Sequence, residues 1–251
     1  MDQYNFLLQS VVKLGHHIFV EKLLKKNDFP VSVYPLILAI TKKDTDMVVI
    51  LLSDKRFDNV YDEALEYAIE VDAVYIVYRI LKIIKRPLDI KHFYAAVKKG
   101  NVAIIELFIS EIDEEYFFQA ANIASSQGNE EVLDYFSNYF TIETANYAKT
   151  GRILEKIGIC PDTIKIQEAI ISNDFNMINA LLLYYSPSDI VSFASSNGKI
   201  NIIKYIKNRF QVIPTRDDCL SAYTNGYVKI SRQIYNIMYK DLSQLRLLIE
   251  D

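Results

Sequence analysis

The 251-residue sequence has few of the residues that interrupt regular structure, with seven glycines and six prolines. No Pro-, Gly- or Ser-rich linker and no low-complexity tract divides it, so one domain covering residues 1–251 is expected. Hydrophobic residues make up 51% of the chain, and their spacing is helical throughout. This composition predicts an all-α protein with a large buried core.

Features that would direct the chain to a membrane or a secretory route are also missing. The N-terminus carries Asp2 where a secretory signal has positive charge, and Gln9 and Ser10 break its apolar run. No stretch of about 18 apolar residues is free of charge, so no membrane span is expected. The net charge of -4 is spread over both halves of the chain, and neither half has the composition of a dedicated polyanion binder.

Motifs that carry catalytic or metal chemistry are absent as well. His16, His17 and His92 form no HxxxH or Cys/His spacing and are interpreted as solvated, so no metal site is expected. The glycines do not cluster into a phosphate-binding loop. The acidic run Glu111–Glu115 is typical of a solvated linker or a helix N-terminus rather than of a catalytic carboxylate pair. The sequence therefore predicts a protein that is not an enzyme and needs no cofactor.

The most informative stretch is FYAAVKKGNVAIIELFIS, residues 93–110. If Gly100 is position zero, Phe93, Ala96 and Val97 mark one face of a helix that ends before the glycine. Ile104 at +4 and Phe108 at +8 mark one face of a helix that begins after it. The stretch is thus a helix, a tight turn and a second helix.

This layout returns along the whole chain at a spacing of 23 to 29 residues. Position zero is always Gly or Asp, which tolerate left-handed or Asx-type turns. Position +8 is apolar in all nine copies. The nine predicted turns lie near Gly15, Asp44, Asp72, Gly100, Gly128, Gly151, Asp174, Gly198 and Gly226. Because a short helix pair cannot bury its apolar face alone, the register predicts a stack of about nine helix-turn-helix units.

Two parts of this pattern are less regular. The sixth unit is the poorest copy, since Glu155 stands at +4 and Gly158 at +7, and a kink is expected there. Residues 240–251 are interpreted as a C-terminal cap. Cys160 and Cys219 lie about two units apart, roughly 20 Å at ordinary helix spacing, so no disulfide is expected.

The repeated segments resemble ankyrin repeats. The family's core pattern has two small residues, two polar residues, a glycine and then aliphatic residues four, five and eight positions later. ASSQGNEEVLDYF (124–136) and ASSNGKINIIKYI (194–206) match it, and AVKKGNVAIIELF (96–108) does so more loosely. With their Tyr, Ile, Asn and Lys content, the units look like divergent repeats of large DNA viruses and intracellular bacterial effectors.

The chain departs from that family in length. A full ankyrin unit has about 33 residues, and the Thr-Pro-Leu-His opening and the Gly-Ala-Asp hairpin are missing here. The resemblance therefore implies a solenoid without long β-hairpin fingers, in which the helix surface and the turns contact partners.

The predicted partner-binding residues lie on two surfaces. Lys42, Lys43, Lys98 and Lys99 are expected to form a basic ridge near the turns, interrupted by Glu70. Position -6, on the expected solvent side of the first helices, carries Glu66, Tyr94 and Asn122. Tyr94 is expected to be exposed, as an amphipathic residue of the kind that interfaces favour.

Three functions fit these features. The first is a non-enzymatic protein–protein interaction scaffold, which the resemblance suggests as a viral factor that binds a host protein in the host cytoplasm. The second is nucleic-acid or polyanion binding through the lysine ridge. The third is a structural or assembly subunit. The identity of the partner and the oligomeric state are left open by the sequence.

Overall fold

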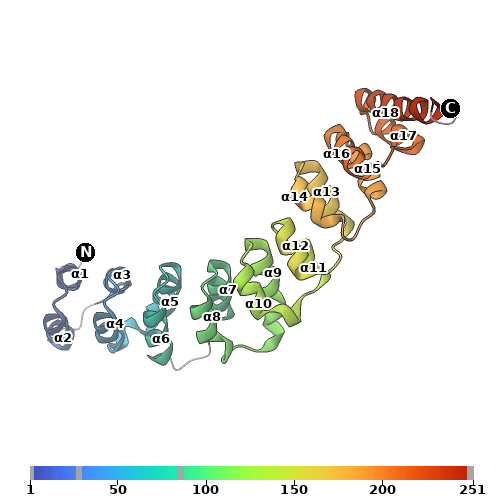
Figure 1. Cartoon of the computed structure of the whole chain (residues 1–251). Coiled ribbons are helices and arrows are strands. Elements are labelled where there is room, and N and C mark those ends of the chain that lie inside the picture. The colour runs from blue at the N-terminus through green and yellow to red at the C-terminus, as the bar shows by residue number, and fades with distance from the viewer. Residues whose placement is uncertain (1–2, 27–29, 84–87, 248–251) are drawn as a thin grey trace. The chain divides into compact units, whose positions relative to one another are not determined.

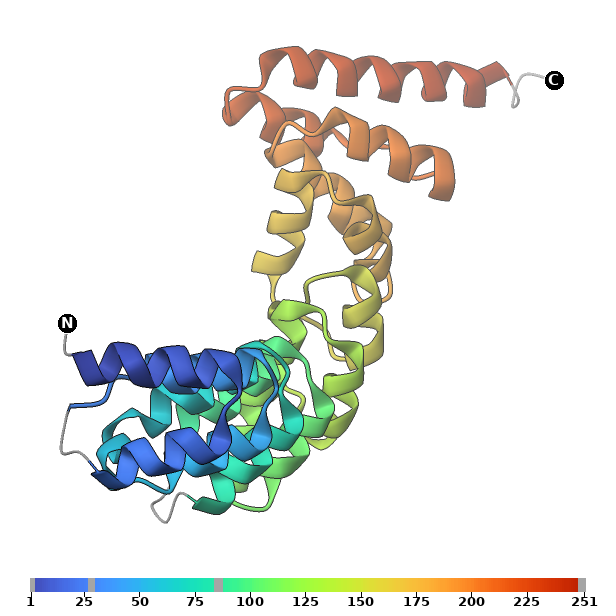
Figure 2. The same cartoon turned by 90° about the vertical axis from the view of Figure 1, so that its left-hand side faces the viewer.

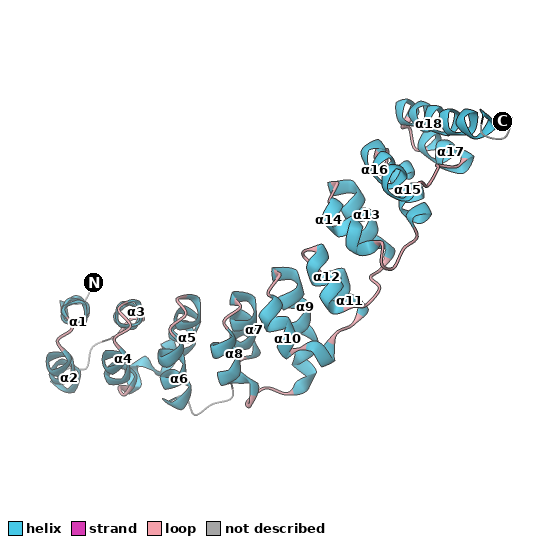
Figure 3. Ribbon diagram, in the orientation of Figure 1, coloured by secondary structure: helices cyan, strands magenta, loops and turns pink. Residues whose placement is uncertain are grey.

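The computed structural model describes residues 3–26, 30–83 and 88–247 (Figure 1), with the side chains of 26 and 241–247 left aside. Every regular element in these residues is a helix, and no strand occurs among them (Figure 3). This confirms the predicted all-α class. Of the predicted cap at 240–251, residues 240–247 continue the last helix and 248–251 lie outside the described residues.

The α-helices follow one another in pairs, each pair joined by a short turn. The pairs are α1 (Gln3–Leu14) and α2 (His17–Lys26), α3 (Tyr34–Thr41) and α4 (Thr45–Leu52), α5 (Tyr61–Glu70) and α6 (Val74–Ile83), α7 (Ile90–Lys99) and α8 (Val102–Ile109), α9 (Phe117–Gln127) and α10 (Glu130–Tyr135), α11 (Ile142–Asn146) and α12 (Gly151–Ile157), α13 (Thr163–Ser172) and α14 (Phe175–Leu181), α15 (Pro187–Ser196) and α16 (Ile200–Phe210), and α17 (Arg216–Thr224) and α18 (Val228–Leu247). Three 3-10 helices lie between pairs, η1 (Lys55–Val60), η2 (Glu114–Tyr116) and η3 (Ser137–Tyr139).

Contacts group the chain into two bodies, Met1–Ala124 with Glu131–Tyr135, and Ser125–Glu130 with Phe136–Asp251. In the N-terminal body α1, α3, α5 and α7 pack on one another in sequence, and so do α2, α4, α6 and α8 (Figures 1 and 2). In the C-terminal body α13, α15 and α17 pack in sequence, as do α12 with α14 and α16 with α18. Equivalent helices of successive pairs therefore pack on one another within each body. The single domain over 1–251 stays a prediction.

Six of the predicted turn residues adopt the left-handed conformation, namely Gly15, Asp72, Gly100, Gly128, Gly198 and Gly226. At Asp44 and Asp174 the turn has the Asx-type form, and the left-handed residue is the one before each aspartate, Lys43 and Asn173. The two aspartates are instead N-caps, whose carboxylates accept hydrogen bonds from the N–H groups of Met47 and Met177 at 3.0 Å.

The predicted turn at Gly151 is wrong. Gly151 is the first residue of α12, and the Thr150 side chain caps the helix by accepting from the Ile153 N–H. The glycine serves packing, since a Cβ atom there would lie 2.5 Å from the carbonyl oxygen of Asn176 in α14. Position zero of this unit is therefore Lys149.

Counting from Lys149 removes the irregularity expected in the sixth unit. Ile153, Leu154 and Ile157 then occupy +4, +5 and +8, and all three are buried, whereas Glu155 is exposed. With the corrected zeros at Lys43, Lys149 and Asn173, position +8 is buried in every pair: Leu23, Leu51, Ile80, Phe108, Phe136, Ile157, Leu181, Ile206 and Ile234.

Position -4 explains how closely the first helices pack. It is Val11 in α1 and alanine in every later pair, and each of these residues is buried: Ala39, Ala68, Ala96, Ala124, Ala145, Ala169, Ala194 and Ala222. The distance between packed helices depends on the side chains at their contact, so a repeated alanine allows close approach.

The corrected register makes neighbouring leucines unequal. Leu181 is fully buried at +8, whereas Leu182, which the uncorrected register placed in the core, is only half-buried. We expect Leu181→Ala to lower the free energy of unfolding by about 2–5 kcal/mol, and Leu182→Ala to lower it clearly less. Chemical denaturation of the two variants tests this. Equal losses would show that the register is wrong.

A second expectation concerns Gly151. Alanine normally stabilises a helix relative to glycine, but here its Cβ would press on the Asn176 carbonyl. We expect Gly151→Ala to destabilise the protein by about 1–3 kcal/mol. Glu155→Ala, an exposed position of the same helix, is the control and should stay within about 0.5 kcal/mol of the wild type. A stabilising Gly151→Ala substitution would contradict the packing role.

Candidate protein-binding surface

A shallow groove of about 420 Å³ crosses the first helices of three consecutive pairs, α3, α5 and α7. We call it the α5 groove. Its lining combines apolar and charged side chains, Ile37, Glu63, Glu66, Tyr67, Glu70, Lys91 and Ala95. The groove lies within the N-terminal body, on helix surfaces that are not part of the core.

The acidic character of the α5 groove follows from helix spacing. Glu63, Glu66 and Glu70 are three and four residues apart, which places them on one side of α5. The Glu66 carboxylate lies 2.9 Å from the Lys91 ammonium, and it raises the pKa of Lys91 chiefly through this hydrogen bond. Tyr67 is held by its hydroxyl, which lies 3.0 Å from Thr41 Oγ1 in α3.

Of the residues predicted at position -6, only Glu66 is found in this groove. Tyr94 is half-buried rather than exposed, with its ring 5.8 Å from that of Phe93. Burial, followed by Tyr116 and Glu115, raises the pKa of Tyr94. The expected solvent position of Asn122 is wrong, because only 3% of Asn122 is exposed.

The burial of Asn122 has a local explanation. Ala120, Ala121 and Ala124 surround it in α9 and are fully buried. Such short side chains let neighbouring segments come close enough to cover an amide at the next position. The burial of a -6 residue thus depends on the size of the side chains at other positions. It cannot be read from the -6 residues alone.

The predicted lysine ridge is exposed but partly engaged. Lys42 donates from Nζ to the carbonyl oxygen of Lys13, at the C-terminal end of α1. Lys99 Nζ lies 3.7 Å from Glu70 Oε1, and Lys43 adopts the left-handed conformation of the turn. Lys98 is exposed beside Lys99.

The contact of Lys42 recurs elsewhere in the chain. Lys149 donates to the Gln127 carbonyl at 3.0 Å, and Lys199 donates to the Ile171 carbonyl at 2.6 Å. In each case an ammonium reaches the C-terminal end of the preceding first helix, where it satisfies a carbonyl and interacts favourably with the helix dipole. The sequence alone did not predict this role, although the lysines near several turns were a signal of it.

His92 is a second correction, since it is not solvated. Only 1% of it is exposed, and neither ring nitrogen has a hydrogen-bond partner among the described residues. Its Nε2 lies 3.7 Å from Glu66 Oε1 and 3.9 Å from Asp62 Oδ1, both in α5. Burial lowers the pKa of His92, and the Asp62 carboxylate opposes that shift. Within the described residues no group of three or more side chains could hold a metal ion.

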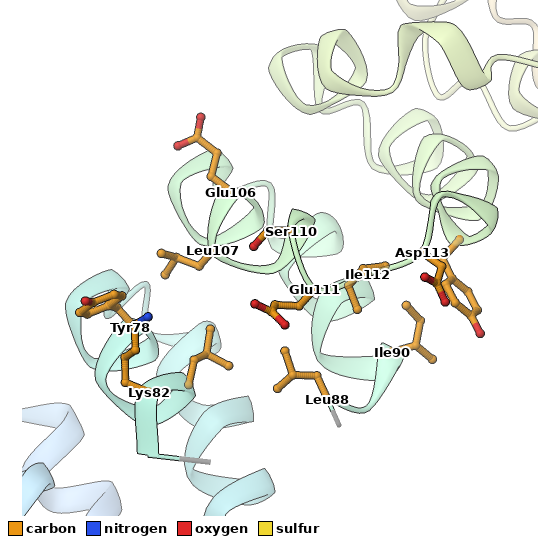
Figure 4. Close-up of a pocket in the computed structure, with 12 residues that line it drawn as sticks. Tyr78, Lys82, Leu88, Ile90, Glu106, Leu107, Ser110, Glu111, Ile112 and Asp113 are labelled. Atoms are coloured by element: carbon orange, nitrogen blue, oxygen red, sulfur yellow. The ribbon is translucent and has the colours of Figure 1, made fainter. Parts of the chain in front are cut away.

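A larger hollow of about 930 Å³ lies beside α6, α8 and η2 (Figure 4). Its lining mixes apolar and charged side chains, such as Leu107 and Ile112 with Glu111. The Lys82 ammonium lies 5.6 Å from the ring centre of Tyr78. Glu106 at its margin already accepts a hydrogen bond from the Tyr135 hydroxyl. Residues 84–87, which adjoin the lining in the chain, lie outside the described residues, and no function is assigned to this hollow.

Comparison with protein-family models and with curated proteins finds no match for this chain. None of the helices in the described residues has the length and apolar character needed to cross a membrane. Both thiols, Cys160 and Cys219, are free, as the sequence predicted.

His92 generates an expectation about pH. Its pKa is lowered in the folded protein, so between that value and about 6.5 the unfolded chain binds a proton more readily. We expect the free energy of unfolding to fall as pH drops below about 6.5, with a contribution from His92 approaching about 1.4 kcal/mol per pH unit.

Denaturation at several pH values, for wild type and His92→Leu, measures this contribution. The slope of the free energy of unfolding against pH on the acid side should be shallower in His92→Leu than in the wild type. An unchanged slope in His92→Leu would show that His92 does not couple folding to protonation.

Proposed function

We propose that this chain is an ankyrin-like helical-repeat solenoid that acts as a non-enzymatic scaffold and binds another protein through the α5 groove. The observation that carries the proposal is the position of this groove on three successive first helices, outside the repeated core. The regular register and the packing of equivalent helices in each body support the solenoid arrangement. The resemblance to divergent viral and effector repeats supports a role on a host protein in the host cytoplasm.

The side chains of the α5 groove indicate what kind of segment it fits. Three glutamates beside Tyr67, Ile37 and Ala95 favour a partner segment that alternates Lys or Arg with apolar residues. The Lys91 ammonium, 2.9 Å from Glu66, already shows a cation seated against this surface. Because the groove lies on packed helices rather than on a loop, binding pays little ordering cost on this side.

Nucleic-acid binding through the lysine ridge has less support. The Lys42 ammonium donates to the carbonyl oxygen of Lys13, and the Lys99 ammonium lies near the Glu70 carboxylate. The acidic groove nearby would also repel phosphate. A titration of labelled RNA or DNA over a salt series distinguishes this alternative, because phosphate contacts give a steep salt dependence.

The groove variant Glu63→Lys with Glu66→Lys tests the protein-binding proposal. Its matched control is Glu21→Lys with Glu155→Lys, which makes the same charge change at exposed positions of second helices. Proteins captured by the wild type should be retained by the control and lost by the groove variant. For the purified partner, we expect the groove variant to bind at least tenfold more weakly, about 1.4 kcal/mol, with its melting temperature nearly unchanged.

The result that contradicts the proposal is specific. If wild-type capture yields proteins that both variants retain equally, the α5 groove is not the binding surface. If labelled nucleic acid binds with a steep salt dependence and the groove variant binds it more tightly, the second function replaces the first.

A further inference from the structure

We propose that copies of this chain associate end to end, the outer face of α1–α2 in one copy packing on the outer face of α17–α18 in the next. The first surface, which we call the N-face, is formed by Leu7 and Phe19. The second, the C-face, is formed by Leu220, Tyr223, Tyr235 and Tyr239. This inference does not depend on the proposed partner protein.

The N-face is built from positions that other pairs keep buried. Phe19 stands at +4 and is 57% exposed, and Leu7 stands at -8 and is 41% exposed. Position -8 is fully buried as Ala64, Ala120 and Ile190. Position +4 is at most 3% exposed in the pairs from the second to the eighth: Met47, Ile76, Ile104, Val132, Ile153, Met177 and Ile202.

The direction of these positions follows from the packing. In α1 and α2 core positions including Leu8, Val12 and Val20 are buried, and the neighbouring pair on which these two helices pack is α3–α4. The exposed side of α1–α2 therefore corresponds to the side that each later pair packs against the pair before it. Positions -8 and +4 mark that side.

The C-face shows the complementary pattern. Tyr223 stands at -3 and is 58% exposed. At this position Val12, Ile40, Val97, Ile170 and Ser195 are at most 1% exposed.

α17 packs on α15 and α18 packs on α16, so the exposed side is the one that earlier pairs turn toward the pair after them. Between α17 and α18 this side holds a groove of about 570 Å³, lined by Tyr223, Tyr235, Tyr239 and Leu220 among others.

These two faces are the two halves of one repeated contact. In the N-terminal body α3–α4 packs on α1–α2 and α5–α6 packs on α3–α4, and the residues Met47, Ala64 and Ile76 at +4 or -8 of these later pairs are buried. A second copy can place Leu7 and Phe19 against the C-face in that same relation. The occupant we infer is therefore a second copy, because its N-face presents the positions that the C-face lacks.

Chemistry supports this assignment. A polar outer face keeps an uncovered helical repeat soluble, whereas the uncovered face of α1–α2 carries Phe19 and that of α17–α18 carries Tyr223, Tyr235 and Tyr239. Aromatic rings carry much of the energy of such contacts. A contact between two different faces does not close on itself in general, so it produces dimers and then longer linear chains.

Sedimentation velocity over a wide range of protein concentration tests the proposal with two variants, Phe19→Lys and Tyr223→Lys. Both residues are exposed, so the fold should be retained, which circular dichroism and the melting temperature verify. The wild type should form dimers and longer species as concentration rises. Each variant alone should remain monomeric where the wild type is at least half associated.

Mixing the variants gives the decisive result. Phe19→Lys keeps an intact C-face and Tyr223→Lys keeps an intact N-face, so an equal mixture should form dimers and nothing longer. Tyr75→Lys, at a 60% exposed tyrosine of α6, is the control and should associate like the wild type.

Each other outcome overturns the inference. A wild type that is monomeric at every concentration shows that copies do not occupy these faces, whether or not another protein does. Dimers of Tyr223→Lys alone indicate a symmetric contact between two N-faces. A mixture that stays monomeric, or association lost in Tyr75→Lys, shows that the two faces are not partners.

Discussion

The structure depends on the inability of its short helices to bury their apolar side chains alone. Most of the α-helices have between 5 and 12 residues, below the length at which an isolated helix is stable in water. Packing on the pair partner and on equivalent helices of neighbouring pairs supplies this burial, as for α3, which packs on α4, α1 and α5. The alanine at -4 is the element of sequence that permits this contact, because it lets neighbouring first helices approach closely.

Polar contacts at the turns add a second connection between successive pairs. His17 Nε2 lies 2.9 Å from the Asp44 carboxylate, and Asn101 donates to Asp72 at 3.2 Å. The lysines that reach preceding carbonyls also satisfy backbone groups that helix ends leave unpaired. Several charged residues near the turns thus stabilise the fold. Fewer charged side chains are therefore available there to bind a ligand.

Two kinds of surface lie outside the buried core and the contacts at the turns. One is the side of the first helices, where α3, α5 and α7 form the acidic α5 groove. The other is the pair of faces that inner pairs use against their neighbours and that α1–α2 and α17–α18 leave exposed. The first surface is acidic, and we propose it for a charged segment of another protein; the second is apolar, and we propose it for a second copy of the chain.

The sequence by itself determined the helical class, the pairing of helices and most of the turns, because apolar spacing and the demand for a left-handed residue are local properties. It also placed Glu66 correctly on the exposed side of α5. Only the tertiary structure decided that Gly151 starts a helix, since its missing side chain matters only where Asn176 approaches. Packing between helices likewise determines the burial of His92 and Asn122 and the partial burial of Tyr94. Periodicity states which face of a helix is apolar, but coverage of a given residue depends on the size of side chains that neighbouring helices bring to it.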